Sequence, residues 1–305
     1  MSQLYADIII DISHSAIDRV FQYRIGAEWE EQVQIGSLVT VPFGKGNAHR
    51  HGYVVGITQT PSYAPDKIKE IAEVPQKGIP IEGKLIQLAA WMRETYGTTM
   101  NQALQTVMPV KQTVRKTIQK VEETKLSEDQ WEFVTLNAEQ QALVDEFAED
   151  VQMSTRKTYL LHGVTGSGKT EVYIQCIKEV IREGGQAIVL IPEISLTYQT
   201  LARFRKHFGT RVAFVNSRQS KGEKYEQFRK AKDGEVDVVI GPRSALFTPF
   251  PNLKLIVMDE EHDSAFKSDQ APRYHARDVA VKRAELENAS VILGSATPSV
   301  ESYAR

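Results

Sequence analysis

The sequence predicts two domains: a small β-rich domain, then an α/β domain in which helices cover both faces of a parallel sheet. Three observations predict this arrangement. From residue 137 on, short apolar runs alternate with helical patterns, as in parallel sheets whose strands are joined by helices. Before residue 110, β-rich runs follow one another with frequent Gly and Pro turns. The length of 305 residues also fits about two domains.

Composition excludes several classes of protein. Because the formal net charge is −2, no global basic field attracts nucleic acid, so any DNA site must be a local groove or pocket. The single cysteine, Cys176, excludes a disulfide framework and a thiolate zinc cluster within this chain, and its apolar helix face predicts a core position. No apolar run approaches ~18 residues and the N-terminus lacks a signal-peptide pattern, so we expect a cytoplasmic protein with no membrane partner.

The first domain is expected to span residues 1–110. Its predicted strands lie at residues 6–12, 21–25, 38–42, 52–57 and 68–74. A helix at residues 83–96 closes it, because apolar residues recur there at helical spacing. Short strands with frequent turns favour a small barrel or a curled sheet. Residues 111–136 are polar and charged, which indicates a solvated linker, with direct phosphate contact as the alternative.

The second domain is expected to span residues 137–305. It opens with a helix that Asn137 caps, with Gln140 at the capping-box position. The predicted strands lie at residues 159–161, 187–191, 211–215, 236–240, 255–258 and 290–293, and the predicted helices at residues 169–182, 195–208, 221–231 and 276–286. Ligands of such sheets bind beyond the carboxyl ends of the strands, where each candidate motif falls.

A phosphate-binding loop is the strongest functional signal in the chain. The pattern G-x-x-x-x-G-K-T runs from residue 163 to residue 170, between an apolar strand and a helix. Its glycines let backbone N–H groups curl around a phosphate, Lys169 reaches the β- and γ-phosphates, and the Thr170 hydroxyl can bind Mg²⁺. The predicted ATP-binding residues are Gly163, Thr165, Gly166, Ser167, Gly168, Lys169 and Thr170.

Two acids follow the apolar run at residues 255–258. Asp259 is predicted to hold Mg²⁺, and Glu260 to orient and deprotonate the attacking water. His262 either relays the state of the nucleotide or lies in a polar core. We therefore predict Lys169, Asp259, Glu260 and His262 as the catalytic residues.

Further strand ends carry candidate DNA contacts. Arg243 and Ser244 follow one strand, where hydroxyls and N–H groups suit a phosphate backbone, although ordinary helix capping gives the same pattern. The loop after the acids is aromatic and basic, which suits base stacking. Its candidates are Phe266, Arg273, Tyr274 and His275. The alternative is a surface loop whose aromatic side chains fold back onto the domain.

The order of these motifs resembles the PriA family, superfamily 2 DNA helicases that restart stalled replication forks. The runs that carry the resemblance are residues 163–173, 191–197, 243–247, 259–262, 272–278 and 293–299. The resemblance implies that residues 137–305 are a RecA-like P-loop helicase lobe and that the first domain is a 3′-end-binding domain. It also implies ATP and Mg²⁺ as cofactors. The implied partners are branched DNA or replication forks with 3′ ends, primosome proteins and single-stranded DNA-binding protein.

By the same resemblance, Phe21, Gly44 and Lys69 line the pocket for the 3′-terminal nucleotide. Gln22 stands where the family commonly has Asp, and an amide accepts a hydrogen bond from a 3′-hydroxyl less strongly than a carboxylate does. Pro242 replaces a usual Thr, which removes an N–H near the DNA path, and Asn216 replaces a usual His.

The resemblance also leaves parts of the family's pattern without a counterpart here. Residues 111–136 are too few for the family's winged-helix domain, which needs over ~50 residues. The chain reaches residue 305 just after a Ser-Ala-Thr motif, so we expect a truncated form without the second lobe and without the zinc ions of the family's cysteine cluster.

The leading hypothesis is therefore the front half of an ATP-dependent 3′→5′ DNA helicase, which binds ATP weakly and turns it over little. A second hypothesis is a DNA-end-binding module whose nucleotide site is not catalytically competent alone. A third is another P-loop enzyme, such as a transporter ATPase or a small-molecule kinase.

Overall fold

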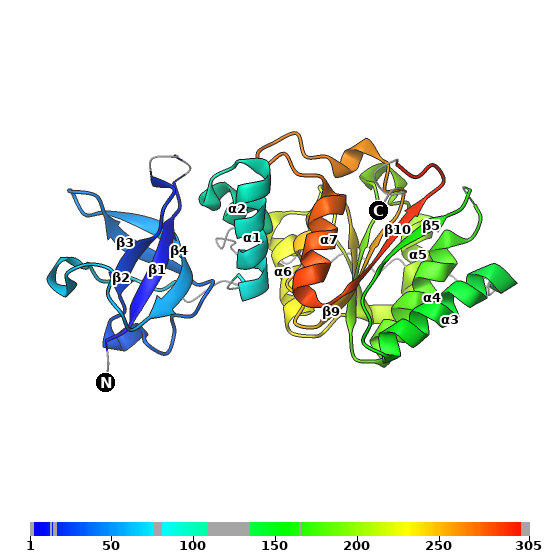
Figure 1. The fold of residues 1–305 in the computed structure, drawn as a ribbon, viewed down its shortest axis with the longest axis horizontal. Coiled ribbons are helices and arrows are strands. Elements are labelled where there is room, and N and C mark those ends of the chain that lie inside the picture. The colour runs from blue at the N-terminus through cyan, green and yellow to red at the C-terminus, as the bar shows by residue number, and fades with distance from the viewer. Residues whose placement is uncertain are drawn as a thin grey trace. The chain divides into compact units, whose positions relative to one another are not determined.

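The computed structural model describes residues 3–12, 14, 17–75, 81–108, 135–164 and 166–299 (Figure 1). The chain divides into two compact units. The first unit comprises Met1–Gln112 with Asp269–Tyr274, and the second comprises Thr113–Ser268 with His275–Arg305. Residues 111–134 of the expected linker lie outside the described residues.

The first unit is built on a four-stranded antiparallel sheet with the order β2-β1-β4-β3. The strands are β1 (Tyr5–Ile10), β2 (Phe21–Arg24), β3 (Leu38–Phe43) and β4 (Ala48–Thr58). Alternate apolar side chains such as Ile8, Val41 and Val54 point into one buried cluster, which explains why these segments form strands. The expected curled sheet has an edge strand on each side, β2 and β3.

The strand that we predicted at residues 68–74 is wrong, because only two isolated bridges form there. Glu70 pairs with Arg24 on β2, and Glu73 pairs with Thr40 on β3. The segment thus crosses from one edge strand to the other and satisfies backbone groups on both, so it cannot pair regularly with either. Its backbone hydrogen bonds curl the sheet toward closure.

Two helices follow the sheet in the first unit: α1 (Gly83–Tyr96), as predicted, and α2 (Met100–Val107), which we did not predict. Thr99 and Gln102 form a capping box at the start of α2. With only eight residues, α2 is too short for a periodic pattern to stand out in the sequence.

The second unit has a six-stranded parallel sheet with the order β5-β10-β9-β6-β8-β7, which confirms the predicted α/β fold. Its strands are β5 (Thr158–His162), β6 (Gln186–Leu190), β7 (Val212–Phe214), β8 (Val238–Gly241), β9 (Leu253–Met258) and β10 (Ser290–Ser295). Its helices are α3 (Ala138–Gln152), α4 (Lys169–Arg182), α5 (Tyr198–Phe208), α6 (Lys221–Lys232) and α7 (Ala276–Glu287).

Both faces of this sheet are covered, because both sets of alternate side chains are buried. Val189 and Val257 pack in one cluster with residues of α3, α4 and α5, while Ile188 and Ile256 are equally buried on the other face. Cys176 lies in that cluster, and burial raises the pKa of its thiol to about 12, so it is a core residue as predicted.

The helix predicted at residues 195–208 starts later than expected. A short 3₁₀ turn occupies Glu193–Ser195, and Thr197 then caps α5 by accepting a hydrogen bond from the N–H of Thr200. Across the described part of the chain, no helix combines the length and apolar character that crossing a membrane requires.

Candidate functional site

The phosphate-binding loop joins β5 to α4 in the second unit. Gly166 and Gly168 have φ of +81° and +88°, a backbone conformation that residues with a Cβ rarely adopt. The loop therefore needs glycine at both positions to turn into α4, whose first two residues are Lys169 and Thr170. Thr165, a predicted ATP-binding residue, lies outside the described residues. The helix start leaves N–H groups available to an anion.

Contacts within the chain hold this loop in its present shape. The Lys169 ammonium donates to the carbonyls of Gly163 at 2.7 Å and Val164 at 3.4 Å. Gln140, in the first turn of α3, donates from Nε2 to the carbonyl of Ser167 at 2.7 Å. Lys169 is only 8% exposed. Its charge is thus held by loop carbonyls where a phosphate would provide stronger partners.

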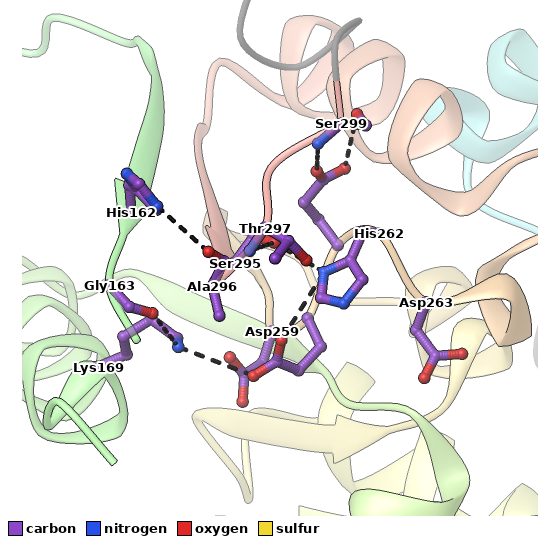
Figure 2. Close-up of polar contacts among 12 residues, drawn as sticks. His162, Gly163, Lys169, Asp259, His262, Asp263, Ser295, Ala296, Thr297 and Ser299 are labelled. Carbon is purple, nitrogen blue, oxygen red and sulfur yellow. Dashed lines mark hydrogen bonds and ion pairs between the residues drawn. The ribbon is translucent and has the colours of Figure 1, made fainter. Parts of the chain in front are cut away.

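The predicted acids meet the loop across the sheet. Lys169 Nζ lies 3.7 Å from Glu260 Oε1, although 91 positions of sequence separate the two residues in the printed numbering (Figure 2). This follows from topology, because β5 and β9 both pair with β10 and so end at one edge of the sheet. Glu260 has φ of +51°, which turns the chain sharply after β9.

Asp259 is partly buried at the end of β9. Burial raises the pKa of its carboxyl, while a hydrogen bond that the Tyr173 hydroxyl donates to Oδ1 at 3.0 Å acts in the opposite direction. Gly294 on β10 leaves room for this contact, since a Cβ there would lie 1.6 Å from the Tyr173 hydroxyl oxygen. Burial and the neighbouring Asp259 also raise the pKa of Tyr173 far above its usual value, so the hydroxyl stays a donor.

His262 links the acids to the end of β10. Its Nδ1 lies 2.7 Å from Ser295 Oγ and 3.7 Å from Glu260 Oε2 (Figure 2). Ser295 Oγ in turn accepts from the N–H of Thr297 at 3.1 Å. The histidine therefore lies between the acid nearest Lys169 and the Ser-Ala-Thr turn, which is the position that a relay of nucleotide state requires.

A buried ion pair supports the same turn. Glu261 is fully buried, accepts from the N–H of Ser299 at 2.8 Å and lies 3.5 Å from Arg277 on α7. Arg277 also donates to Ser299 Oγ at 2.7 Å. Because a buried carboxylate without partners is very costly, this pair fixes where the segment after β10 leaves the sheet.

The residues at this edge fit ATP with Mg²⁺. Among the described residues, no three or more His, Cys, Asp and Glu side chains are arranged so that they alone could hold a metal ion. Mg²⁺ needs no such cage, because it usually takes one or two protein oxygens beside phosphate oxygens and waters. Asp259 supplies a partly buried carboxylate whose pKa is raised by burial, and Thr170 supplies a hydroxyl from the first turn of α4.

The predicted DNA contacts of this unit are less exposed than the sequence suggested. Arg243 donates to the carbonyls of Ala265 and Lys267 at 3.0 and 2.5 Å, so its guanidinium fastens the loop after the acids. Phe266 is fully buried and Tyr274 is 5% exposed, so neither ring is open to stack on a base in this structure. This matches our alternative, in which the aromatic side chains fold back.

The remaining candidate DNA contacts, in this loop and in the turn after β8, differ in exposure. Arg273 is exposed, and Ser244 is partly buried. His275 caps α7 by accepting from the N–H of Arg277 at 3.2 Å, and burial, followed by the charge of Arg277, lowers the pKa of the imidazole. The neutral ring is the form that can accept this bond.

The first unit contains a hollow at the β2 edge of its sheet, which we call the edge pocket. Its volume is about 820 Å³, and it is lined by Ile17, Arg19, Phe21, Gln22, Tyr23, Phe43, Gly44, Lys45, Asn47, Tyr63, Lys67, Ile68 and Lys69. The three residues predicted for a 3′-terminal nucleotide, Phe21, Gly44 and Lys69, are all among them. Lys69 Nζ donates to the carbonyl of Gly44 at 2.9 Å.

Sequence reasoning missed several residues that line this pocket. Arg19 stacks its guanidinium 5.0 Å from the Phe21 ring centroid, and Phe43 packs edge-on against the same ring at 5.1 Å. Tyr63 is 59% exposed and adds a second aromatic face. Arg19 and Tyr63 lie in loops that carry no recognisable motif. The one sequence signal for Arg19 is that it lies two residues before Phe21, and Tyr63 has no such signal.

Each of the two units matches the model of a known protein family. Residues 137–305 match the family model of the DEAD/DEAH box helicases, and residues 7–109 match the model of a 3′ DNA-binding domain. The model that matches residues 7–109 is that of the PriA 3′ DNA-binding domain. Because the first model covers more than half of the chain, the chain belongs to the DEAD/DEAH box helicase family.

Within that family the relatives are PriA proteins. The replication restart protein PriA of Chlamydia muridarum is 33% identical over 99% of this chain and 50% of its own length. PriA of Bacillus subtilis is 53% identical over 56% of this chain and 21% of its own length. The chain spans about half the length of the curated relatives it matches along its whole sequence, and it resembles the N-terminal part of PriA.

One solved structure is also similar to this chain. RecG bound to a three-way DNA junction matches 56% of this chain and 22% of its own, with 26% sequence identity and a TM-score of 0.43.

Proposed function

We propose that this chain is the front half of an ATP-dependent 3′→5′ DNA helicase that acts on replication forks with 3′ ends. The observation that carries the proposal is the meeting of Lys169 and Glu260, 3.7 Å apart, at the edge where β5, β9 and β10 end. Nucleotide hydrolysis needs a lysine that binds the phosphates and, beside it, an acid that can orient the attacking water.

In the proposed site, Lys169 leaves the loop carbonyls and pairs with the β- and γ-phosphates. Thr170 and Asp259 hold Mg²⁺, which neutralises phosphate charge when it is bound. Glu260 orients the attacking water and takes its proton at a carboxylate oxygen. His262 then reports the change at Glu260 to Ser295, because it lies within contact of both residues.

The edge pocket is the proposed site for the 3′-terminal nucleotide. Phe21 offers an aromatic surface, Gly44 leaves open space in which no atom lies within 4 Å of an added Cβ, and Lys69 is fixed beside it. The other proposed DNA contacts are Arg243, Ser244, Phe266, Arg273, Tyr274 and His275, and the buried rings among them need a rearrangement before they touch DNA.

Residues 137–305 provide only part of the groups that we expect ATP hydrolysis to need. Motors of this class hydrolyse ATP between two lobes, so half of the electrostatic stabilisation comes from groups outside residues 137–305. We therefore expect this chain alone to bind ATP weakly and to turn it over slowly.

We also propose residues 111–136 as a linker in place of a winged-helix domain. The alignment with the Chlamydia muridarum relative is 378 positions long, more than the 305 residues here, so that relative carries additional residues.

The partners belong to the same proposal. The relatives' name, replication restart protein, supports a role in DNA replication. We further propose branched DNA as the substrate, and primosome proteins and single-stranded DNA-binding protein as partners in the cytoplasm. The tests begin with DNA, because DNA binding separates this proposal from a P-loop transporter ATPase or a small-molecule kinase.

The experiment has two arms on the same purified chain. Binding of a fork with a 3′ arm end is compared with binding of a closed circle that has no end, and ATP turnover is measured with and without the fork. We expect preference for the fork, and slow turnover that Lys169→Ala abolishes while end binding stays unchanged. Equal affinity for fork and circle contradicts end binding, and robust fork-stimulated turnover contradicts the need for a second lobe.

A second candidate function is a pure DNA-end-binding module. One observation favours it: the described residues that line the edge pocket all lie in the first unit, so end binding needs nothing from the nucleotide site. End binding without any ATP binding would select this candidate.

A further inference from the structure

The edge pocket has a one-sided charge. Among the described residues that line it, Arg19, Lys45, Lys67 and Lys69 are basic, and none is Asp or Glu. A bound internal nucleotide brings one negative charge per phosphodiester, whereas a terminal phosphate monoester brings about −1.5 to −2 at neutral pH. Nothing in the lining repels that additional charge, and four cations attract it.

Gln22 is the lining residue that decides this balance. Its Oε1 accepts from the N–H of Ser62 at 2.6 Å, and its Nε2 donates to Asp7 Oδ1 at 3.1 Å. The side chain is 8% exposed, so both ends of the amide are committed to holding the loop at residue 62 against β1. It therefore presents a neutral, fixed group to the pocket.

Asp7, the nearest carboxylate to Gln22, lies behind it. Asp7 pairs with Gln22 across β1 and β2, and with Gly56 across β1 and β4, so it is one strand further from the edge. A Cβ on Gly56 would come within 3.2 Å of Asp7 Oδ2, so one carboxylate oxygen faces β4 while the other, Oδ1, accepts from Gln22. Asp7 is not among the lining residues, and the Gln22 amide separates it from them.

We propose that the edge pocket accepts DNA ends that carry a 3′-terminal phosphate, and binds them more tightly than ends with a 3′-hydroxyl. The inference rests on the proposed end-binding function. A carboxylate at position 22 would repel a dianionic terminus, whereas the amide with four basic neighbours attracts it. Such ends arise from chemistry that breaks the strand on the 5′ side of a nucleoside and leaves its phosphate on the preceding sugar.

The test compares three single-stranded oligonucleotides of one sequence: one with a 3′-phosphate, one with a 3′-hydroxyl and a 5′-phosphate, and a closed circle. The first two have the same charge, so a difference between them reports the position of the phosphate. By competition anisotropy near 50 mM salt, we expect the 3′-phosphate to bind about threefold to tenfold more tightly than the 3′-hydroxyl isomer.

A double variant moves the negative charge from position 7 to position 22 without changing the net charge of the chain. Asp7→Asn with Gln22→Glu exchanges carboxylate and amide across the two strands, so the hydrogen bond between them can re-form while the negative charge comes to the pocket. We expect this exchange variant to reverse the preference, and Asp7→Asn alone to keep it. Unchanged hydrogen-exchange protection in β1 and β4, which belong to the same unit as both substituted residues, checks that each variant is folded.

The outcomes separate the inference from the function on which it rests. If the wild-type chain prefers the 3′-hydroxyl isomer, the inference is overturned while end binding stands, whether or not the exchange variant folds. If the circle competes as well as either linear oligonucleotide, both the end-binding function and the inference are overturned. A 3′-phosphate preference that the exchange variant retains assigns the preference to residues other than Gln22 and overturns its role.

Discussion

The nucleotide site and the edge pocket treat charge in opposite ways. Around the nucleotide site two cations face carboxylates: Lys169 lies 3.7 Å from Glu260, and Arg277 lies 3.5 Å from Glu261. In the edge pocket four basic side chains line one hollow with no carboxylate among the described lining residues. The first arrangement suits a ligand that brings both anion and metal, and the second suits an anion alone.

The difference also separates stability from binding. Charges that are buried with partners hold the second unit together, so losing one partner costs folding energy. Exposed charges around a pocket contribute little to folding and mainly attract the ligand. Substitutions in the two regions should therefore fail in different assays.

The largest expected effect comes from the buried pair. Arg277→Met leaves the fully buried Glu261 without its cationic partner, which we expect to cost about 3 kcal/mol of stability. Hydrogen exchange followed by mass spectrometry should show lost protection in β9, β10 and α7, with β1 and β4 unchanged. The control is Arg273→Met, an exposed residue of the neighbouring loop, where we expect less than about 0.5 kcal/mol. Equal losses of stability in Arg277→Met and Arg273→Met would contradict the view that only the buried charge pair supports folding.

A smaller effect is expected within the nucleotide site. Tyr173→Phe removes the hydrogen bond to Asp259 Oδ1, and a bond to a carboxylate is worth about 1 to 2 kcal/mol. ATP binding in the presence of Mg²⁺ should weaken about fivefold to 30-fold, while binding in a chelator should stay unchanged, because only the orientation of the carboxylate is lost. A similar loss in the chelator would show that Tyr173 supports the phosphate-binding loop instead.

These sites also differ in how much of them the sequence predicts. Lys169, Asp259, Glu260 and His262 were predicted as one site because parallel strands bring motif residues to a shared edge whatever lies between them. The topology does not reveal side chains that reach the site from within an element. Tyr173 is such a residue: it looks like any core tyrosine of α4 until the absence of a side chain at Gly294 is seen to make room for it.

The edge pocket was harder to predict, because loops build most of it. Phe21 and Gly44 belong to β2 and the turn after β3, which carry recognisable patterns. Tyr63 and Lys67 come just before the segment at residues 68–74, which we misassigned as a strand. That segment bridges two edge strands, and such a crossing depends on the curvature of the sheet, which the local sequence does not encode. The burial of Phe266 was likewise open, since an aromatic loop reads the same whether it faces in or out.

The smallest effect is expected in the edge pocket. Lys67→Gln removes one exposed cation, which should weaken binding of a 3′-ended oligonucleotide about threefold and lower the salt slope by about 0.7. Folding should be unaffected. Lys84→Gln, on α1 and outside the pocket lining, is the matched control and should change neither quantity. Equal changes in both variants would mean that DNA binds over the whole unit, not in the pocket.

The central claim is that Lys169 and the acids after β9 form one nucleotide site, and one measurement tests it directly. Equilibrium binding of ATP is measured with Mg²⁺ and with a chelator for the wild-type chain, Lys169→Ala and Asp259→Asn. We predict that Lys169→Ala weakens binding about 100-fold in both conditions, since charge-assisted contacts to phosphate are lost. Asp259→Asn should weaken binding only when Mg²⁺ is present. Unchanged Mg²⁺ dependence in Asp259→Asn, or full ATP binding in Lys169→Ala, would contradict the claim.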